Sequence, residues 1–303
     1  MPAAASSANA PTWRLWLLAS RPKTLLAGAV PVLTGAWLAA RLDHSFSALL
    51  LALTLGSCLA LQVATNLFND AIDADKGADT ARRLGPQRLT ASGLVSPARM
   101  LRAAFLVLAA ATLLALPLWW WRGWPIMAIG LPSLWFCYGY TGGPWPLAYR
   151  GLGELFVIGF FGVVAVAGSQ FVLSGQWSGA GLLAGLQLGL LSAVLIAINN
   201  LRDIDEDRAS GKRTLAARFG LGFGRGLIAS LLLLPFALGL GWGLAGHTWA
   251  AWLPLLALPL SAVLLLGVLR HPPGPLYNRL LGLSALHLLL FASLWAIGLT
   301  QTT

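Results

Sequence analysis

Nine apolar stretches, each close to the length that crosses the ~30 Å hydrocarbon core of a bilayer, constrain the fold of this chain most. They cover residues 25–40, 46–68, 101–121, 124–140, 152–174, 180–201, 226–245, 250–269 and 279–299. Only 10% of the 303 residues are charged, whereas a soluble domain carries about 25%. This composition excludes a soluble enzyme, a secreted disulfide scaffold and a disordered chain. The sequence predicts an all-α, polytopic membrane protein with nine transmembrane helices.

The distribution of the stretches also predicts the domain organisation. Residues 1–12 are rich in Ala and Ser and precede the first stretch, so we expect a disordered N-terminal tail. Residues 13–303 are predicted to form a single transmembrane domain. The third and fourth stretches are separated only around Gly123, where we expect one helix to end and another to begin.

The basic residues predict the orientation of the chain in the membrane. The formal net charge of +10 suggests nucleic acid, but the charges lie in short loops between apolar stretches, which is the pattern of cytoplasmic anchoring. With the N-terminus in the cytoplasm, nine spans place every Lys and Arg except Arg41 and Arg122 on the cytoplasmic side. The sequence therefore predicts a multi-pass membrane protein with a cytoplasmic N-terminus and no nucleic-acid partner.

An acidic motif follows the second stretch. If that helix continues to about Gly77, its polar residues share an arc about 100° wide, because successive residues turn by about 100°. These residues are Gln62, Asn66, Asn69, Asp70 and Asp73. Asp75 points the other way, and Asp79 falls in the following loop. We call residues 66–79 the first acidic motif.

A second acidic motif, residues 199–208, follows the sixth stretch. On a helix, one face carries Asn199, Asp203, Glu206 and Asp207, and Asp205 lies opposite. Three positions match the first motif at a constant offset, which indicates a weak internal repeat. The matching pairs are Asn66 with Asn199, Asp70 with Asp203, and Asp73 with Glu206. Under the threading above, both motifs lie at cytoplasmic helix ends.

The two motifs indicate a magnesium and diphosphate site. Converging carboxylates repel one another, and a divalent cation relieves that repulsion. Oxygen ligands without His or Cys favour Mg²⁺, which needs one or two carboxylates and takes substrate phosphates as further ligands. The loops that follow carry basic residues suited to phosphate oxygens, although membrane anchoring also explains them. These basic residues are Arg82, Arg83, Arg88, Arg208, Lys212 and Arg213.

Two further features lie in the middle of the chain. Gly181, Gly185 and Gly189 recur at a spacing of four, which predicts close packing of helices. Glu154 is an isolated acid near a helix start. Compensation of the helix dipole explains Glu154 about as well as a functional role does.

The chain resembles the UbiA superfamily of intramembrane prenyltransferases, most closely the branch that prenylates 1,4-dihydroxy-2-naphthoate. The matching stretches are residues 21–25, 66–79, 83–86, 140–154, 160–162 and 199–215. Many members carry a third acid four residues after the second Asp of the first motif. Here that position is Gly77 and the acid is Asp79, a spacing that is similar to the naphthoate branch.

The resemblance implies a bundle of nine helices around a central cavity and transfer of a polyprenyl group from polyprenyl diphosphate to the naphthoate, with release of diphosphate and CO2. It implies that Asp70, Asp73, Asp203 and Asp207 hold Mg²⁺ and act in catalysis with Asn66. Aromatic side chains such as Tyr140, Phe160 and Phe161 would stabilise the allylic cation. The substrate-binding residues implied are Lys23, Asn69, Asp79, Arg83, Arg88, Tyr140, Asn199, Asn200, Arg202 and Lys212.

Two alternatives stay open from the sequence. The same chemistry suits another aromatic acceptor, such as 4-hydroxybenzoate or homogentisate. A secondary transporter also suits nine spans and a repeat, but its coupling acids are expected near mid-span. Every acid except Asp43 lies at the predicted cytoplasmic ends, and Asp43 lies in an outside loop.

Overall fold

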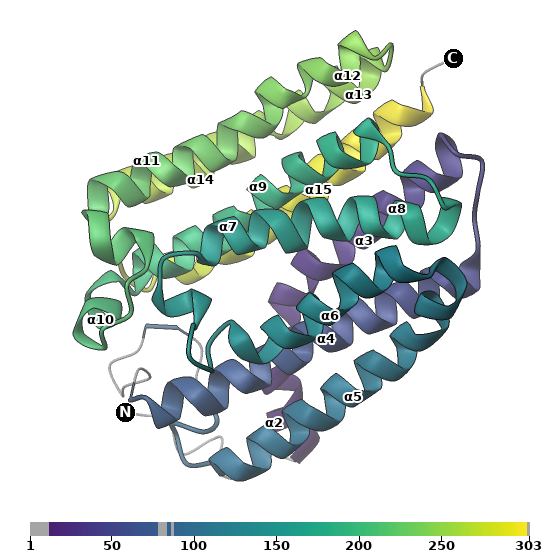
Figure 1. Ribbon diagram of the computed structural model, residues 1–303. Coiled ribbons are helices and arrows are strands. Elements are labelled where there is room, and N and C mark those ends of the chain that lie inside the picture. The colour runs from purple at the N-terminus through teal and green to yellow at the C-terminus, as the bar shows by residue number, and fades with distance from the viewer. Residues whose placement is uncertain (1–11, 78–83, 86–87, 302–303) are drawn as a thin grey trace.

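The computed structural model describes residues 12–77, 84–85 and 88–301, apart from the side chains of Thr12 and Lys23. Helices are the regular secondary structure throughout these residues, and Figure 1 shows the long ones running side by side. The first half contains α2 (Thr12–Ser20), α3 (Pro22–Arg41), α4 (Ala48–Asp75), α5 (Pro97–Arg122), α6 (Trp124–Gly139), η1 (Leu147–Tyr149), α7 (Gly153–Val157), η2 (Ile158–Val164) and α8 (Ala165–Ser174). The second half contains α9 (Gly179–Arg202), α10 (Ile204–Ala209), α11 (Leu215–Leu238), α12 (Leu240–Leu244), α13 (Thr248–Trp252), η3 (Leu253–Ala257), α14 (Leu258–Arg270) and α15 (Tyr277–Thr300).

The all-α membrane fold predicted from the sequence is confirmed, and the count of nine spans is approximate. Within the described residues, eight helical segments are long and apolar enough to cross a bilayer. The remaining predicted span is α6, whose 16 residues extend about 24 Å at 1.5 Å per residue. The apolar pattern of the sequence did not predict α2. Residues 1–11 of the predicted tail lie outside the described residues, and α2 begins at Thr12.

The helix boundaries follow local backbone chemistry. Gly123 has a φ of 70° and separates α5 from α6, as the sequence predicts. Gly77 has a φ of 65° and follows the end of α4 at Asp75, so the first acidic motif is helical as far as its last buried carboxylate. Arg21 also has a positive φ, of 54°, and turns the chain between α2 and α3.

Glycines allow the central helix α9 to pack closely against η2, a π-helical turn between α7 and α8. A Cβ atom at Gly189 would lie 2.5 Å from the carbonyl oxygen of Ile158, and one at Gly185 would lie 2.7 Å from the Cα of Val163. The opposite glycine, Gly162, would place a Cβ atom 2.3 Å from the Cα of Gly189. The predicted close packing at this glycine stripe is confirmed.

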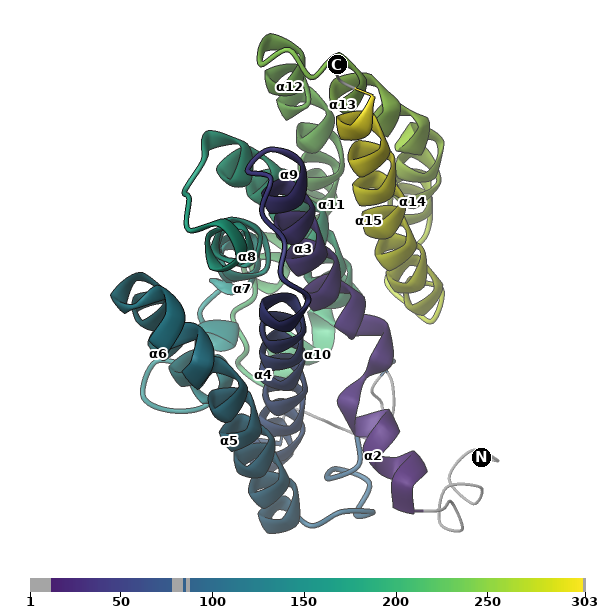
Figure 2. The same ribbon diagram turned by 90° about the vertical axis from the view of Figure 1, so that its right-hand side faces the viewer.

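The topology brings the two acidic motifs to one end of the bundle. The C-terminal ends of α4 and α9, together with α10, lie close enough for a direct contact between Asp73 and Lys212. The first described helix, α2, and the C-terminal end of α15 lie at opposite ends of the bundle (Figure 2). This arrangement fits a chain that crosses the bilayer an odd number of times.

Candidate functional site

A cavity of about 740 Å³, lined by residues from α2 to α10 and from α15, reaches both acidic motifs. Its polar end is lined by Asp70, Asp73, Asn199, Asp203 and Asp207. Its apolar end lies near the far ends of α5, α6 and α8, with Leu118, Trp119, Ile126, Ile129 and Val172 in its wall. The cavity therefore extends along the bundle from a polar, charged end to an apolar end.

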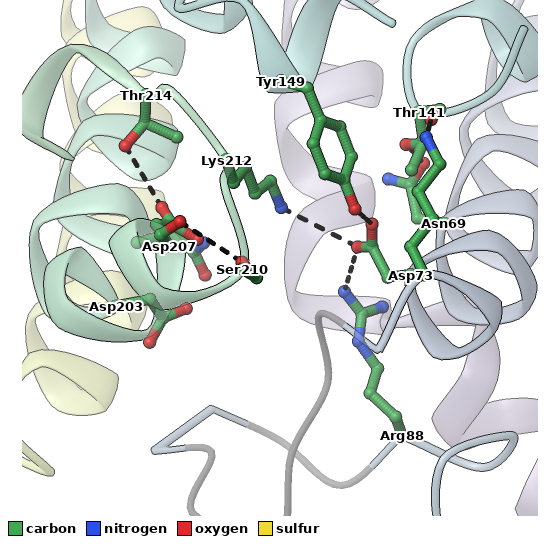
Figure 3. A network of polar contacts seen from close by, with 12 residues as sticks. Asn69, Asp73, Arg88, Thr141, Tyr149, Asp203, Asp207, Ser210, Lys212 and Thr214 are labelled. Carbon is green, nitrogen blue, oxygen red and sulfur yellow. Dashed lines mark hydrogen bonds and ion pairs between the residues drawn. The ribbon is translucent and has the colours of Figure 1, made fainter. Parts of the chain in front are cut away.

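Asp73 is the centre of the polar contacts, as Figure 3 shows. Its Oδ1 accepts a hydrogen bond of 2.9 Å from the hydroxyl of Tyr149. Its Oδ2 lies 3.6 Å from a guanidinium nitrogen of Arg88 and 3.8 Å from Nζ of Lys212. Burial and the neighbouring carboxylate of Asp73 raise the pKa of Tyr149, so its hydroxyl stays protonated and donates. Groups from three separate segments therefore meet at this carboxylate, which is only 3% exposed.

Asp207 faces the same cavity from α10. Its Oδ2 accepts a hydrogen bond of 3.2 Å from the hydroxyl of Thr214, and its carbonyl oxygen accepts one of 2.8 Å from the backbone N–H of Lys212. Burial raises the pKa of Asp207 to about 6, and the nearby carboxylates of Asp203 and Asp73 add to that shift. Lys212 and the Thr214 hydroxyl oppose it. The loop after α10 is thereby folded so that Lys212 reaches across to the first motif.

Asp203 caps α9 and is paired with its own neighbour. The guanidinium of Arg202 donates to both carboxylate oxygens, at 2.7 and 2.6 Å. Arg202 also donates to Oδ1 of Asn199 at 2.9 Å and to Oδ1 of Asn278 at 2.7 Å. Because Arg202 is only 2% exposed, this network fixes the second motif against α15.

Asp70 holds the loop that follows the first motif. Its two carboxylate oxygens accept hydrogen bonds from the backbone N–H groups of Leu89, at 3.2 Å, and Thr90, at 2.9 Å. These bonds fix the chain next to Arg88, whose guanidinium contacts Asp73. Asp70 thus positions a basic group at the polar end of the cavity.

The side-chain amides of the first motif, Asn66 and Asn69, form hydrogen bonds with neighbouring segments. Asn66 donates to the carbonyl oxygen of Ser20 at 2.9 Å and to the hydroxyl of Thr24 at 3.3 Å, which ties α4 to the turn between α2 and α3. Asn69 accepts a hydrogen bond from the hydroxyl of Thr141. Both amides therefore shape the wall of the cavity.

Aromatic rings form one wall between the polar and apolar ends. Phe156 and Phe160 stack with centroids 4.5 Å apart, and Tyr140 lies 5.4 Å from Phe156. Phe136 meets Phe160 edge-on at 5.5 Å. All four residues line the cavity, and so does Phe161.

Most of the side chains singled out from the sequence line this cavity. They are Asn66, Asn69, Asp70, Asp73, Arg88, Tyr140, Asn199, Asn200, Arg202, Asp203, Asp207 and Lys212. Asp79 and Arg83 lie outside the described residues, and so does the side chain of Lys23 in α3. As predicted, Asp75 is exposed, and the carboxylate of Asp205 is 91% exposed.

Several residues of the site were missed from the sequence. Tyr149 and Thr141 contact the first motif directly, and Asn278 anchors Arg202 from α15. Lys76 donates to the carbonyl oxygen of Thr141 at 2.7 Å, and its Nζ lies 4.2 Å from the centre of the Tyr149 ring. Tyr149 lies in the Gly- and Pro-rich segment between Gly142 and Gly151, and its position in the sequence does not show which carboxylate it contacts.

The sequence of this chain is similar to those of several known proteins. The profile of the UbiA prenyltransferase family matches residues 28–274. The 1,4-dihydroxy-2-naphthoate octaprenyltransferases of Haemophilus influenzae and Escherichia coli are 32% and 35% identical to this chain, over 82% and 81% of it and 83% and 82% of their own lengths. The relative of that name from Mycobacterium tuberculosis is 37% identical over 74% of this chain and 77% of its own.

Solved structures agree at the level of the fold. The structure of a UbiA homolog from Archaeoglobus fulgidus superposes with a TM-score of 0.68 at 14% identity, covering 94% of this chain and 99% of that one. The structure of a UbiA homolog from the same organism bound to GPP and Mg²⁺ gives a TM-score of 0.62 at 15% identity, covering 93% and 99%. On the family profile and on these relatives, the chain belongs to the UbiA prenyltransferase family.

Proposed function

We propose that this chain is a Mg²⁺-dependent prenyltransferase that transfers a polyprenyl group from polyprenyl diphosphate to 1,4-dihydroxy-2-naphthoate in menaquinone synthesis. The observation that carries the proposal is a single cavity with residues of both acidic motifs at its polar end and apolar side chains at its other end. A polyprenyl tail leaves an apolar environment only at a cost of ~0.8 kcal/mol per CH₂. If the tail lies in the apolar end of the cavity, that cost is avoided while the diphosphate lies at the polar end.

The acidic residues suit Mg²⁺. Magnesium is held in proteins by one or two carboxylates, with water and substrate phosphates as its other ligands. Among the described residues, no three His, Cys, Asp or Glu side chains gather so that they alone could hold a metal ion. Asp70, Asp73, Asp203 and Asp207 would hold the ions. When bound, Mg²⁺ would draw charge from the diphosphate and make it a better leaving group.

The basic residues receive the leaving diphosphate. Arg88 and Lys212 reach the same carboxylate from different loops, so both cations lie at the polar end of the cavity. Charge-assisted hydrogen bonds from such groups stabilise phosphate oxygens as negative charge develops. Lys23 and Arg83 are proposed as further substrate ligands from the sequence pattern alone.

The proposed prenyl transfer requires no net proton transfer to or from the protein. The bond between the allylic carbon and the diphosphate oxygen breaks, and its electron pair leaves with the diphosphate. The faces of Tyr140, Phe156 and Phe160 stabilise the allylic cation. The acceptor ring forms the new carbon–carbon bond, and the ring carboxylate leaves as CO2, whose bonding electrons restore aromaticity. The products are demethylmenaquinol, CO2 and diphosphate.

The proposed location is a bacterial inner membrane, with the N-terminus and both motifs on the cytoplasmic side. The support is the asymmetry of the basic residues, all of which except Arg41 and Arg122 fall on that side in a nine-span threading. Residues 13–303 are proposed to act as one transmembrane domain, preceded by a tail.

The test is mass spectrometry of the product made by purified protein in lipid nanodiscs. The protein is given one polyprenyl diphosphate and a panel of acceptors: 1,4-dihydroxy-2-naphthoate, 4-hydroxybenzoate and homogentisate. We expect a prenylated naphthalenediol from the first acceptor, formed only with Mg²⁺. Product from another acceptor alone would identify the same chemistry on a different substrate. Absence of prenyl transfer to all three would contradict the proposal and leave transport as the alternative to test.

A further inference from the structure

Glu154 places a carboxylate with unused hydrogen-bonding capacity in the wall of the cavity. It is the second residue of α7 and is only 3% exposed. Its Oε1 accepts a hydrogen bond of 2.9 Å from Nδ2 of Asn200. Its Oε2 is buried and has no hydrogen-bond partner within the described part of the chain. A buried acceptor without a donor is costly, by about 1–3 kcal/mol, so this oxygen is suited to a donor supplied by a ligand.

The neighbourhood of Glu154 suits an aromatic ligand. Two residues further along the chain, Phe156 stacks on Phe160, and Tyr140 lies against Phe156. These rings line the same cavity as Glu154. A Cβ atom at Gly153 would lie 2.9 Å from the hydroxyl oxygen of Tyr140. The glycine before Glu154 therefore lets the Tyr140 ring approach the start of α7.

We propose that Glu154 binds the aromatic acceptor by accepting a hydrogen bond from a ring hydroxyl at Oε2, while Asn200 holds Oε1. The inference rests on the proposed function and names the group that recognises its acceptor. A carboxylate that accepts this bond polarises the O–H group and raises the electron density of the ring, which favours attack on the allylic cation. The hydroxyl keeps its proton, because loss of CO2 supplies the electrons that restore aromaticity.

The variant Glu154→Gln tests this role with little change of shape. If its amide oxygen stays with Nδ2 of Asn200, its Nε2 presents a donor where the carboxylate presents an acceptor. We expect the KM for 1,4-dihydroxy-2-naphthoate to rise about tenfold or more, with the KM for polyprenyl diphosphate unchanged. Two acceptor analogues, each with one hydroxyl replaced by methoxy, extend the test. The wild type should turn over one of these analogues much more slowly than the parent acceptor. The Glu154→Gln variant should not show this difference between the same analogue and the parent acceptor.

Equilibrium dialysis of the labelled acceptor, without polyprenyl diphosphate, gives a second measurement that needs no turnover. We expect the Glu154→Gln protein to bind the acceptor about tenfold more weakly. The matched control is Asp205→Asn in α10, since this carboxylate is 91% exposed; its binding and turnover should match the wild type. The thermal unfolding midpoint of each variant reports the fold.

The outcomes separate this inference from the proposed function. Wild-type acceptor affinity in Glu154→Gln overturns the inference, and so does retained discrimination between the hydroxyl and methoxy acceptors. A parallel rise in the KM of both substrates also overturns it, because that result indicates a structural role at the helix start. If the wild type forms no product with any acceptor, the proposed function fails, and the dialysis still decides whether Glu154 binds a hydroxylated aromatic acid.

Discussion

Nζ of Lys212 lies 3.8 Å from Oδ2 of Asp73, so the loop after the second acidic motif contacts a buried carboxylate of the first. Both side chains line the cavity. Two helix ends far apart in the sequence are thereby joined across the space proposed for the diphosphate.

Removing the Lys212 ammonium should weaken binding of the diphosphate substrate. Because a hydrogen bond to a charged group contributes about 1.5–3 kcal/mol, we expect Lys212→Met to raise the KM for polyprenyl diphosphate about tenfold or more. Lys212→Arg keeps the charge and should recover part of the loss. Steady-state kinetics with varied diphosphate substrate checks this, and an unchanged KM in Lys212→Met would show that the contact is only structural.

Tyr149 should act through the orientation of Asp73. Its hydroxyl donates to Oδ1 of Asp73, and its ring lies beside the ammonium groups of Lys76 and Lys212, at 4.2 and 5.5 Å. Tyr149→Phe keeps the ring and removes one hydrogen bond, so we expect kcat to fall by roughly tenfold while the protein remains folded. Tyr149→Ala should lose more. Equal activity of Tyr149→Phe and the wild type would show that the Tyr149 hydroxyl is not needed to orient Asp73.

The raised pKa of Asp207 predicts a pH dependence of stability in metal-free protein. Its folded pKa of about 6 exceeds the ordinary value of 3.8, so the folded state binds the proton more tightly than the unfolded state. The stabilisation is complete below about pH 4 and is lost as the pH rises through 6. Thermal unfolding in EDTA between pH 4 and 7 measures it. Asp207→Asn should flatten this part of the profile, and identical profiles would contradict the assignment.

The close packing of α9 on η2 predicts that Gly189→Ala destabilises the fold. The added methyl group would lie 2.5 Å from the carbonyl oxygen of Ile158, and overpacking of this kind costs about 1–3 kcal/mol. Gly226→Ala in α11 is the matched control, since no atom lies within 4 Å of its added Cβ. Thermal unfolding in detergent should separate the two variants. A Gly189→Ala protein as stable as the control would be inconsistent with this packing.

Trp119 should limit the length of the prenyl chain. It lines the apolar end of the cavity and also a surface groove that includes Leu116, Trp120 and Met127. Gly130 leaves room for its indole, because a Cβ atom there would lie 2.7 Å from Nε1 of Trp119. Trp119→Ala removes this wall and should shift the preference towards longer prenyl diphosphates. Product masses from a panel of donors, farnesyl to octaprenyl, report the change, and an unaltered preference would place the limit elsewhere.

The sequence predicted the helices well because their signals are local. Apolar length located the spans, and Gly77 and Gly123 marked helix ends through backbone conformations that suit glycine. Helical spacing correctly placed Asp73 and Asp207 on faces that meet the cavity and left Asp75 and Asp205 exposed. The helix α2 was missed because its apolar patch, Leu15 to Ala19, is short and is soon followed by Arg21, Pro22 and Lys23.

The contacts of the site were less predictable because they depend on tertiary structure. Spacing along α4 does not show that Asp70 binds the backbone of Leu89 and Thr90, or that Asp203 is paired with Arg202. Asn278 lies on the last helix and meets Arg202 only after the bundle forms. Glu154 was left between two interpretations because its partner, Asn200, comes from another helix.

Magnesium-dependent turnover of Asp73→Ala and Asp203→Ala, measured as coupled release of diphosphate and CO2 from polyprenyl diphosphate and 1,4-dihydroxy-2-naphthoate, tests the joint action of the two motifs most directly. We predict that each substitution abolishes release of both products while the variants elute from size exclusion as the wild type does. Full turnover in either variant would contradict the assignment of that motif to the reaction.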